Sequence, residues 1–103
     1  MKLIAVITTV DNMDDAQNIA TAAIKSRLAA CAQIEEISSI YSWKGQIENT
    51  KEIRITFKTT STRWHELKAQ ITASHPYEIP AIYSLKIVDV NESYLEWANQ
   101  INH

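Results

Sequence analysis

The residues that usually shape turns and hold cofactors are scarce in this chain. Of its 103 residues, one is glycine, two are proline and one is cysteine. A single glycine excludes the glycine-rich loops that bind nucleotide phosphates, because those loops need two or more glycines at fixed spacing. A single cysteine, Cys31, excludes an intrachain disulfide and zinc sites built on cysteine pairs. The few turn residues that are present therefore mark places where the backbone requires them.

Neither a basic surface nor a long hydrophobic run is present. The formal net charge is −2, whereas nucleic-acid binding needs a basic face. The apolar run at the start covers only residues 3–7, which is too short for a signal-peptide core or a membrane span. No pair of titratable groups stands at a recognisable catalytic spacing. We therefore expect one cytoplasmic domain over residues 1–103 that is not an enzyme and binds neither nucleic acid nor membrane.

The hydrophobic periodicity predicts strand, helix, strand, strand, helix and strand, followed by a short last helix. The expected strands cover 3–10, 31–43, 47–59 and 81–88, and the helices begin near 11–15, at 61–62 and at 93. This order is typical of an α+β fold of the ferredoxin-like type, in which two helices cover one face of a four-stranded antiparallel sheet.

Local details of these elements are also predicted. Gly45 is expected in a tight hairpin turn, at a position with positive φ. Ile37 is out of phase with the apolar residues before it, which predicts a β-bulge near Glu35 and Glu36. Ser61 or Thr62 is expected to cap the second helix, and the Ser-x-x-Glu spacing that starts at Ser93 predicts a capping box for the last one.

The two central strands are unusually long. At about 3.3 Å per residue, strands of this length span on the order of 40 Å. A compact chain of this size has a diameter of roughly 33 Å, so the hairpin should extend beyond its own domain. Because an exposed ribbon with free edges tends to pair with other chains, we expect self-association through the 31–59 hairpin.

Five segments together resemble the CutA family of divalent-cation tolerance proteins. They are LAACAQI (28–34), YSWKGQIE (41–48), EIRITFKTT (52–60), HPYEIP (75–80) and YLEW (94–97). The resemblance implies a ferredoxin-like subunit in a homotrimer paired through the hairpin, with an architecture similar to the PII signalling proteins. It also implies a role in tolerance of copper and other divalent cations, without enzyme activity.

Three positions depart from the family pattern. Thr8 and Ser74 stand where some members carry a cysteine and a second histidine associated with copper, and Ala81 stands where an acidic residue is common. A high-affinity copper site needs more thiolate or imidazole than His75 alone supplies.

The segment HPYEIP holds both prolines of the chain and has two interpretations. In the first, it is a rigid connector between a helix and a strand, because proline restricts its own backbone and that of the residue before it. In the second, His75 and Glu78 lie in an intersubunit cleft as ligands for copper or another divalent cation, weakly bound. Four further residues are candidates for lining that cleft: Trp43, Glu52, Lys58 and Tyr77.

Two functions stay open at this stage. The chain is either a trimeric tolerance protein that binds divalent cations weakly, or a PII-like sensor or scaffold that binds a small molecule or a partner protein. A third possibility, an RNA-binding module of the same fold, is disfavoured because the strand RITFKTT carries one aromatic residue and the chain is acidic.

Overall fold

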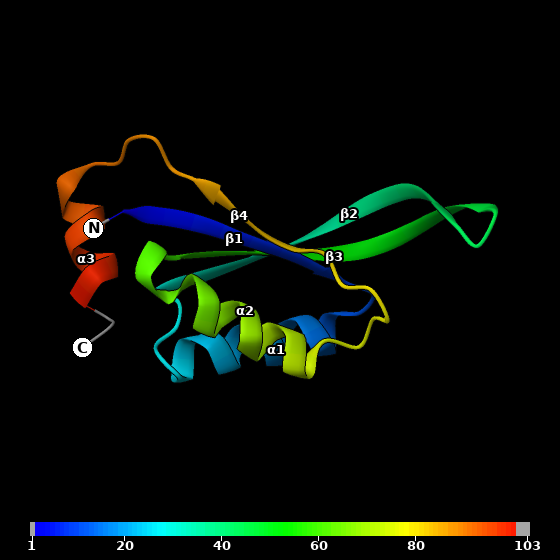
Figure 1. Ribbon diagram of the computed structural model, residues 1–103, viewed down its shortest axis with the longest axis horizontal. Helices are drawn as coiled ribbons and strands as arrows, with labels where there is room; N and C mark the ends of the chain where they lie inside the picture. Colours follow the sequence, from blue (N-terminus) through cyan, green and yellow to red (C-terminus); the bar gives the residue numbers. More distant parts are fainter. Residues whose placement is uncertain (1, 101–103) are drawn as a thin grey trace.

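The computed structural model describes residues 2–100, and its elements follow the order expected from the sequence (Figure 1). The strands are β1 Leu3–Val10, β2 Cys31–Trp43, β3 Gln46–Thr60 and β4 Ile82–Lys86. The helices are α1 Met13–Lys25, α2 Trp64–Ser74 and α3 Glu92–Gln100, and a 3-10 turn, η1 Ser61–Arg63, precedes α2. The strands form one antiparallel sheet in the order β2-β3-β1-β4, which confirms the ferredoxin-like α+β fold.

Helices α1 and α2 pack side by side on one face of the sheet (Figure 1). The core between them contains Val6 of β1 and Phe57 of β3, together with Ile19 of α1 and Leu67 of α2, all of them buried. Since side chains alternate along a strand, the neighbours of these core residues point to the other side of the sheet. The buried face of each strand therefore fixes which residues remain on the opposite face.

That opposite face, called the uncovered face below, lacks a helix over most of its length. The strand register places Lys58 opposite Ala5 there, and Tyr83 opposite Ile7. Helix α3 covers only the end where β1 starts, since Leu3 and Ala98 pack together in a second small core. The exposed fractions of Tyr83 and Leu85 on β4 are 46% and 50%, so apolar surface remains open on this side.

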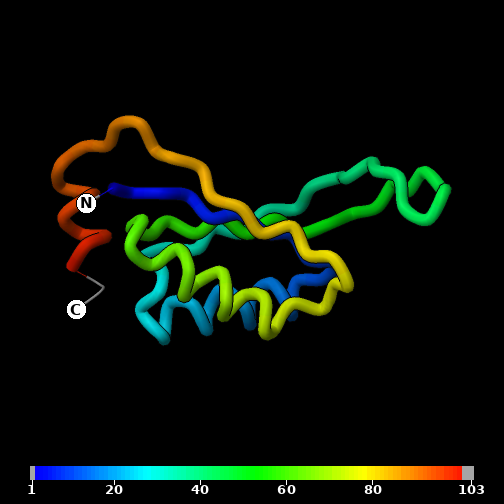
Figure 2. The backbone as a smooth tube through the Cα atoms, viewed as in Figure 1, coloured from blue at the N-terminus to red at the C-terminus, as the bar shows by residue number. Residues whose placement is uncertain are grey.

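The β2–β3 hairpin projects far beyond the helices (Figure 2). The molecule measures 45 × 25 × 21 Å along its principal axes, so the expected overhang is present. Lys44 and Gly45 form its two-residue turn with φ of 49° and 79°, the conformation that this kind of hairpin requires. Near the tip, Ile40 and Ile47 are 72% and 82% exposed.

The predicted bulge is wrong. The pairing between β2 and β3 runs without interruption from Cys31 opposite Lys58 to Trp43 opposite Gln46. Ile37 is out of phase because it belongs to the uncovered face, where it lies opposite Glu52. An isolated isoleucine on the second face of a strand therefore produced the apparent shift.

Two predicted helix caps also differ from the structure. No side-chain hydrogen bond caps α2, because the chain enters it through η1 and the Thr62 hydroxyl bonds that of Thr60 instead, at 3.0 Å. Helix α3 begins one residue before Ser93, whose hydroxyl accepts a hydrogen bond from the Asn91 side chain at 2.9 Å. At α1, by contrast, the Asn12 side chain accepts a hydrogen bond from the backbone N–H of Asp15 at 2.8 Å, as expected for an N-cap. No helix within residues 2–100 has the length and apolar character needed to cross a membrane.

Candidate functional site

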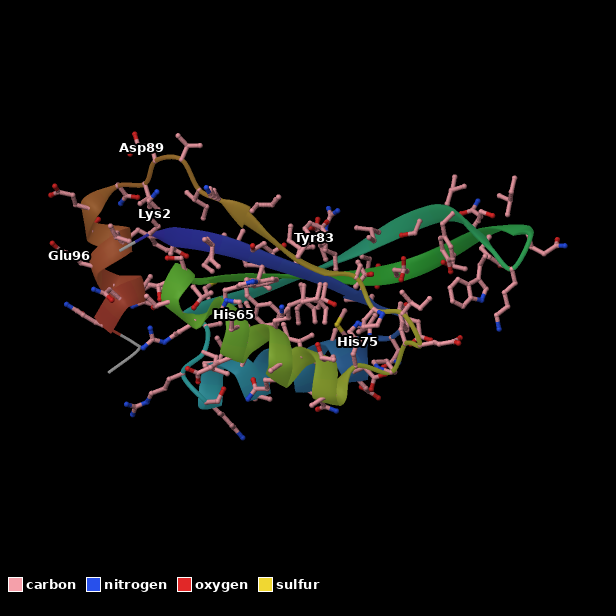
Figure 3. The ribbon with its side chains drawn as sticks, in the orientation of Figure 1. Lys2, His65, His75, Tyr83, Asp89 and Glu96 are labelled. Atoms are coloured by element: carbon pink, nitrogen blue, oxygen red, sulfur yellow. The ribbon has the colours of Figure 1, made fainter. Side chains whose placement is uncertain are left out.

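The connector between α2 and β4 is fixed to the end of β1 by His75. The backbone of His75 is extended, with φ −73° and ψ 132°, as expected for the residue before Pro76. The ring atom Nε2 lies 2.9 Å from the Thr9 carbonyl oxygen and 3.1 Å from the Thr8 hydroxyl, and Nδ1 accepts a hydrogen bond from the backbone N–H of Tyr77 at 3.1 Å. Figure 3 shows His75 where α2 passes into the connector. The first interpretation of HPYEIP, a rigid connector, has a direct structural basis here.

These hydrogen bonds define the charge state of the imidazole. Because Nδ1 accepts a hydrogen bond, the neutral ring carries its proton on Nε2 and donates it to the Thr9 carbonyl. Burial lowers the pKa of His75, and the Thr9 carbonyl and the carboxylates of Asp15 and Glu52 act in the opposite direction. A metal ion bound at either nitrogen would have to replace one of these hydrogen bonds.

A second pair of residues joins the connector to the hairpin. The Tyr77 hydroxyl donates a hydrogen bond of 2.7 Å to Oε2 of Glu52, whose side chain points to the uncovered face of β3. Glu52 is only 8% exposed, so this is a charged group largely withdrawn from water. Burial and the neighbouring carboxylate raise the pKa of Tyr77 well above its usual range, and the phenol therefore stays a donor.

A groove of about 370 Å³ opens beside this pair, where the hairpin leaves the body of the domain. Its lining contains two carboxylates, three aromatic rings and a few small or apolar residues. These are Thr9, Tyr41, Trp43, Glu52, Tyr77, Glu78, Ile79 and Ala81. A volume above roughly 300 Å³ is the size at which small-molecule sites begin.

The structure brings together most of the residues singled out from the sequence. Trp43, Glu52, Tyr77 and Glu78 all line the groove, although they come from the hairpin and the connector. His75 lies behind Tyr77, with a distance of 4.9 Å between the two ring centroids, and does not line the groove.

Lys58 stands apart from this group. It lies six residues along β3 from Glu52, roughly 20 Å at the rise of a strand, and its Nζ donates a hydrogen bond of 2.6 Å to Oε1 of Gln33. Its role in ligand binding, like the metal role of His75 and Glu78, stays a prediction.

A divalent cation requires several donor atoms around it. Within residues 2–100 no group of three or more histidine, cysteine, aspartate or glutamate side chains is placed to hold a metal ion. The groove offers oxygen donors from Glu52 and Glu78, which are the ligands that hard cations prefer, whereas copper favours nitrogen and sulfur. The described part of one chain therefore supplies an incomplete set of ligands.

Sequence reasoning missed Thr9 and Ile79 as groove residues. Thr9 could have been predicted from the alternation of side chains along β1, because every second residue of a strand points away from the face that packs on the core. Ile79 carries no comparable signal, since it lies in an irregular connector.

The fold and the groove together define a class of protein: a single ferredoxin-like α+β domain with a projecting hairpin and a groove at its base. The sequence profile of the CutA1 divalent ion tolerance protein family matches residues 4–101. The chain therefore belongs to this family.

Individual relatives agree with that assignment. The divalent-cation tolerance protein CutA of Pyrococcus horikoshii is 41% identical over 95 residues, which cover 92% of this chain and 93% of that protein. A crystal structure of CutA1 from the same organism is similar with a TM-score of 0.94 and 38% identity, covering 97% of this chain and 98% of that one. A structure from Archaeoglobus fulgidus, described as a periplasmic divalent cation tolerance protein CutA, has a TM-score of 0.95 at 28% identity and covers 98% of this chain and 99% of that one.

Proposed function

We propose that this chain is a homotrimeric, cytoplasmic divalent-cation tolerance protein that binds copper or another divalent cation weakly and catalyses no reaction. Relatives such as those from Pyrococcus horikoshii and Thermus thermophilus carry the name divalent-cation tolerance protein. The observation that supports cation binding is the pair of carboxylates, Glu52 and Glu78, in one groove. Binding is weak because a single chain offers few donors, and water or a neighbouring subunit supplies the others.

The proposed trimer is supported by apolar surface that a monomer leaves in water. Ile40 and Ile47 near the hairpin tip, and Leu85 on the uncovered face, are at least half exposed. Strands β2 and β4 are the two edges of the sheet, and no strand formed by residues 2–100 pairs with the outer side of either. Burial of this surface between subunits would stabilise an assembly by about 25 cal/mol for each Å² of apolar area removed from water.

Native mass spectrometry of metal-stripped protein tests both parts of the proposal. Three chains of 11.7 kDa each should give a particle of about 35 kDa, and copper or zinc should add three ions in discrete steps. A monomer mass at micromolar concentration would contradict the trimer, and uptake of ions without a plateau would contradict a specific cation site. Exclusively extracytoplasmic recovery of the protein on cell fractionation would contradict the proposed location.

Two substitutions locate the cation site. Glu78→Gln keeps the shape of an exposed side chain and removes one carboxylate, so it should reduce the number of bound ions. Glu66→Gln on the exposed face of α2 is the matched control and should change nothing. If His75→Gln rather than Glu78→Gln abolishes uptake, the cation is bound by the imidazole, and Glu78 is not one of its ligands.

A substitution on the uncovered face tests the interface. Leu85→Asp places a charge on apolar surface that the proposed trimer buries, so the particle should dissociate toward the monomer mass. Asn18→Asp, on the exposed side of α1, introduces the same charge elsewhere and should leave the mass unchanged.

A second function, a small-molecule sensor or scaffold, is favoured by a different observation. Tyr41, Trp43 and Tyr77 supply three aromatic rings to the groove, which is more apolar surface than a hydrated cation uses. A thermal-shift screen in which small organic molecules, but not divalent cations, raise the melting temperature would select this function over the first.

A further inference from the structure

We propose that the groove binds a small organic ammonium ion, namely a protonated primary amine with a short apolar body. This inference rests on the second proposed function, because it names the ligand class of the same groove. It is carried by the combination of a largely buried carboxylate, a second carboxylate and aromatic rings around one cavity of about 370 Å³.

The charge of the lining selects a cation. Among residues 2–100, Glu52 and Glu78 are the charged residues of the lining, and no lysine, arginine or histidine of this range lines it. Within residues 2–100 no basic side chain forms an ion pair with Glu52, whereas the exposed Glu35 is paired with Arg54 at 2.9 Å. A carboxylate that is nine-tenths buried and lacks a positive partner is costly, and a bound cation would offset that cost.

Glu52 also has the geometry to accept a hydrogen bond from a ligand. The Tyr77 hydroxyl occupies Oε2 of the carboxylate at 2.7 Å, and an ionised carboxylate has acceptor sites beyond that single bond. An ammonium group with N–H donors can use these sites, whereas a quaternary ammonium cannot. A protonated primary amine carries the most N–H donors of the organic ammonium ions and is therefore the preferred ligand.

The aromatic rings distinguish an organic cation from a metal ion. Tyr41, Trp43 and Tyr77 line the groove, and a cation near the face of an aromatic ring is attracted by the ring quadrupole. Lys44 already shows this preference, since its Nζ lies 5.6 Å from the centroid of the Trp43 ring. Ile79 and Ala81 add apolar surface that would contact the carbon chain of an amine and would contribute nothing to a bare metal ion.

Calorimetric titration of the full-length protein with butylamine tests the inference, with butanol as the neutral analogue and butyrate as the anionic one. We expect butylamine to bind with one site per chain and at least tenfold more tightly than either analogue. Glu78→Gln and Trp43→Leu should each weaken butylamine binding severalfold, because each removes an attraction to the positive charge. Glu66→Gln on α2 is the control and should bind as the unmodified protein does.

Lys44→Met provides a variant that should bind more tightly. It frees the face of the Trp43 ring and removes a competing positive charge, so butylamine affinity should rise about two- to fivefold. Weaker binding by Lys44→Met would show that the groove does not act as a cation site.

The ammonium inference and the small-molecule sensor function can fail separately. If butanol or butyrate binds as tightly as butylamine, the ammonium inference is overturned while a small-molecule site remains. If none of the three binds, the ammonium inference is overturned, and the thermal-shift screen with other small organic molecules decides the sensor function separately. Copper or zinc uptake measured on the same samples decides the tolerance function independently.

Discussion

The hydrogen bond between Tyr77 and Glu52 gives the most direct test of how the groove is held together. Tyr77→Phe removes only the phenol oxygen, which donates to the carboxylate at 2.7 Å. Hydrogen bonds to charged groups contribute about 1.5–3 kcal/mol, and an acceptor left buried without its donor adds a desolvation cost. Glu52 is 8% exposed and borders a groove open to water, which places the expected loss near the middle of that range, at about 2 kcal/mol.

Urea unfolding at neutral pH and fixed protein concentration measures this loss. Fixed concentration is needed because an assembled protein gains stability by mass action. For a domain of this size, about 2 kcal/mol lowers the urea midpoint by about 1 M. Tyr83→Phe is the matched control, because the Tyr83 hydroxyl has no hydrogen bond among residues 2–100 and should shift the midpoint little.

The double variant Tyr77→Phe with Glu52→Met separates the hydrogen bond from general packing. With the carboxylate also removed, no buried acceptor is left without a partner, so the double variant should be more stable than Tyr77→Phe alone. A loss below about 0.5 kcal/mol for Tyr77→Phe would refute the reasoning, since surface changes commonly have effects of that size. A double variant less stable than the single one would refute it as well.

Three further predictions concern other parts of the fold. Because burial lowers the pKa of His75, the unfolded chain binds a proton at this side chain more readily than the folded one. The free energy of unfolding should therefore be full above the unfolded pKa near 6.5 and fall as the pH drops below it. His75→Gln should flatten this pH dependence in unfolding titrations. Gly45→Ala should cost about 1 kcal/mol in thermal unfolding, because φ is +79° and no atom within 4 Å adds a steric term; an unchanged melting temperature would contradict this. Glu35→Gln should leave the melting temperature nearly unchanged, because its ion pair with Arg54 is exposed; a clear loss of stability would mean that this surface is covered in solution.

The sequence allowed the fold to be predicted because its strongest signals are local. The single glycine falls at the hairpin turn, and the proline after His75 ends α2 at Ser74, as expected. The alternation of Ile53, Ile55 and Phe57 along β3 is a signal of the same kind, and these side chains lie in the core. Each of these signals acts through a few neighbouring residues.

Errors arose where the decisive partner is distant in the sequence. Tyr83 and Leu85 alternate with polar residues, as on one face of a strand, but only pairing with β1 shows that this face is the uncovered one. Ile37 suggested a bulge because a strand pattern does not reveal a second apolar face. In the site, Glu52 and Tyr77 were singled out separately, and the contact between them depends on how the connector is placed against β3.

The projecting hairpin also has a mechanical consequence. Two walls of the groove belong to different parts of the chain: Tyr41 and Trp43 lie on the arm, and Tyr77 and Glu78 on the connector fixed to the body. An arm within a molecule 45 Å long acts as a lever, so a small change in angle at its base becomes a large displacement at its tip. A ligand that fills the groove would contact both the arm and the body, so its binding would restrict the angle between them.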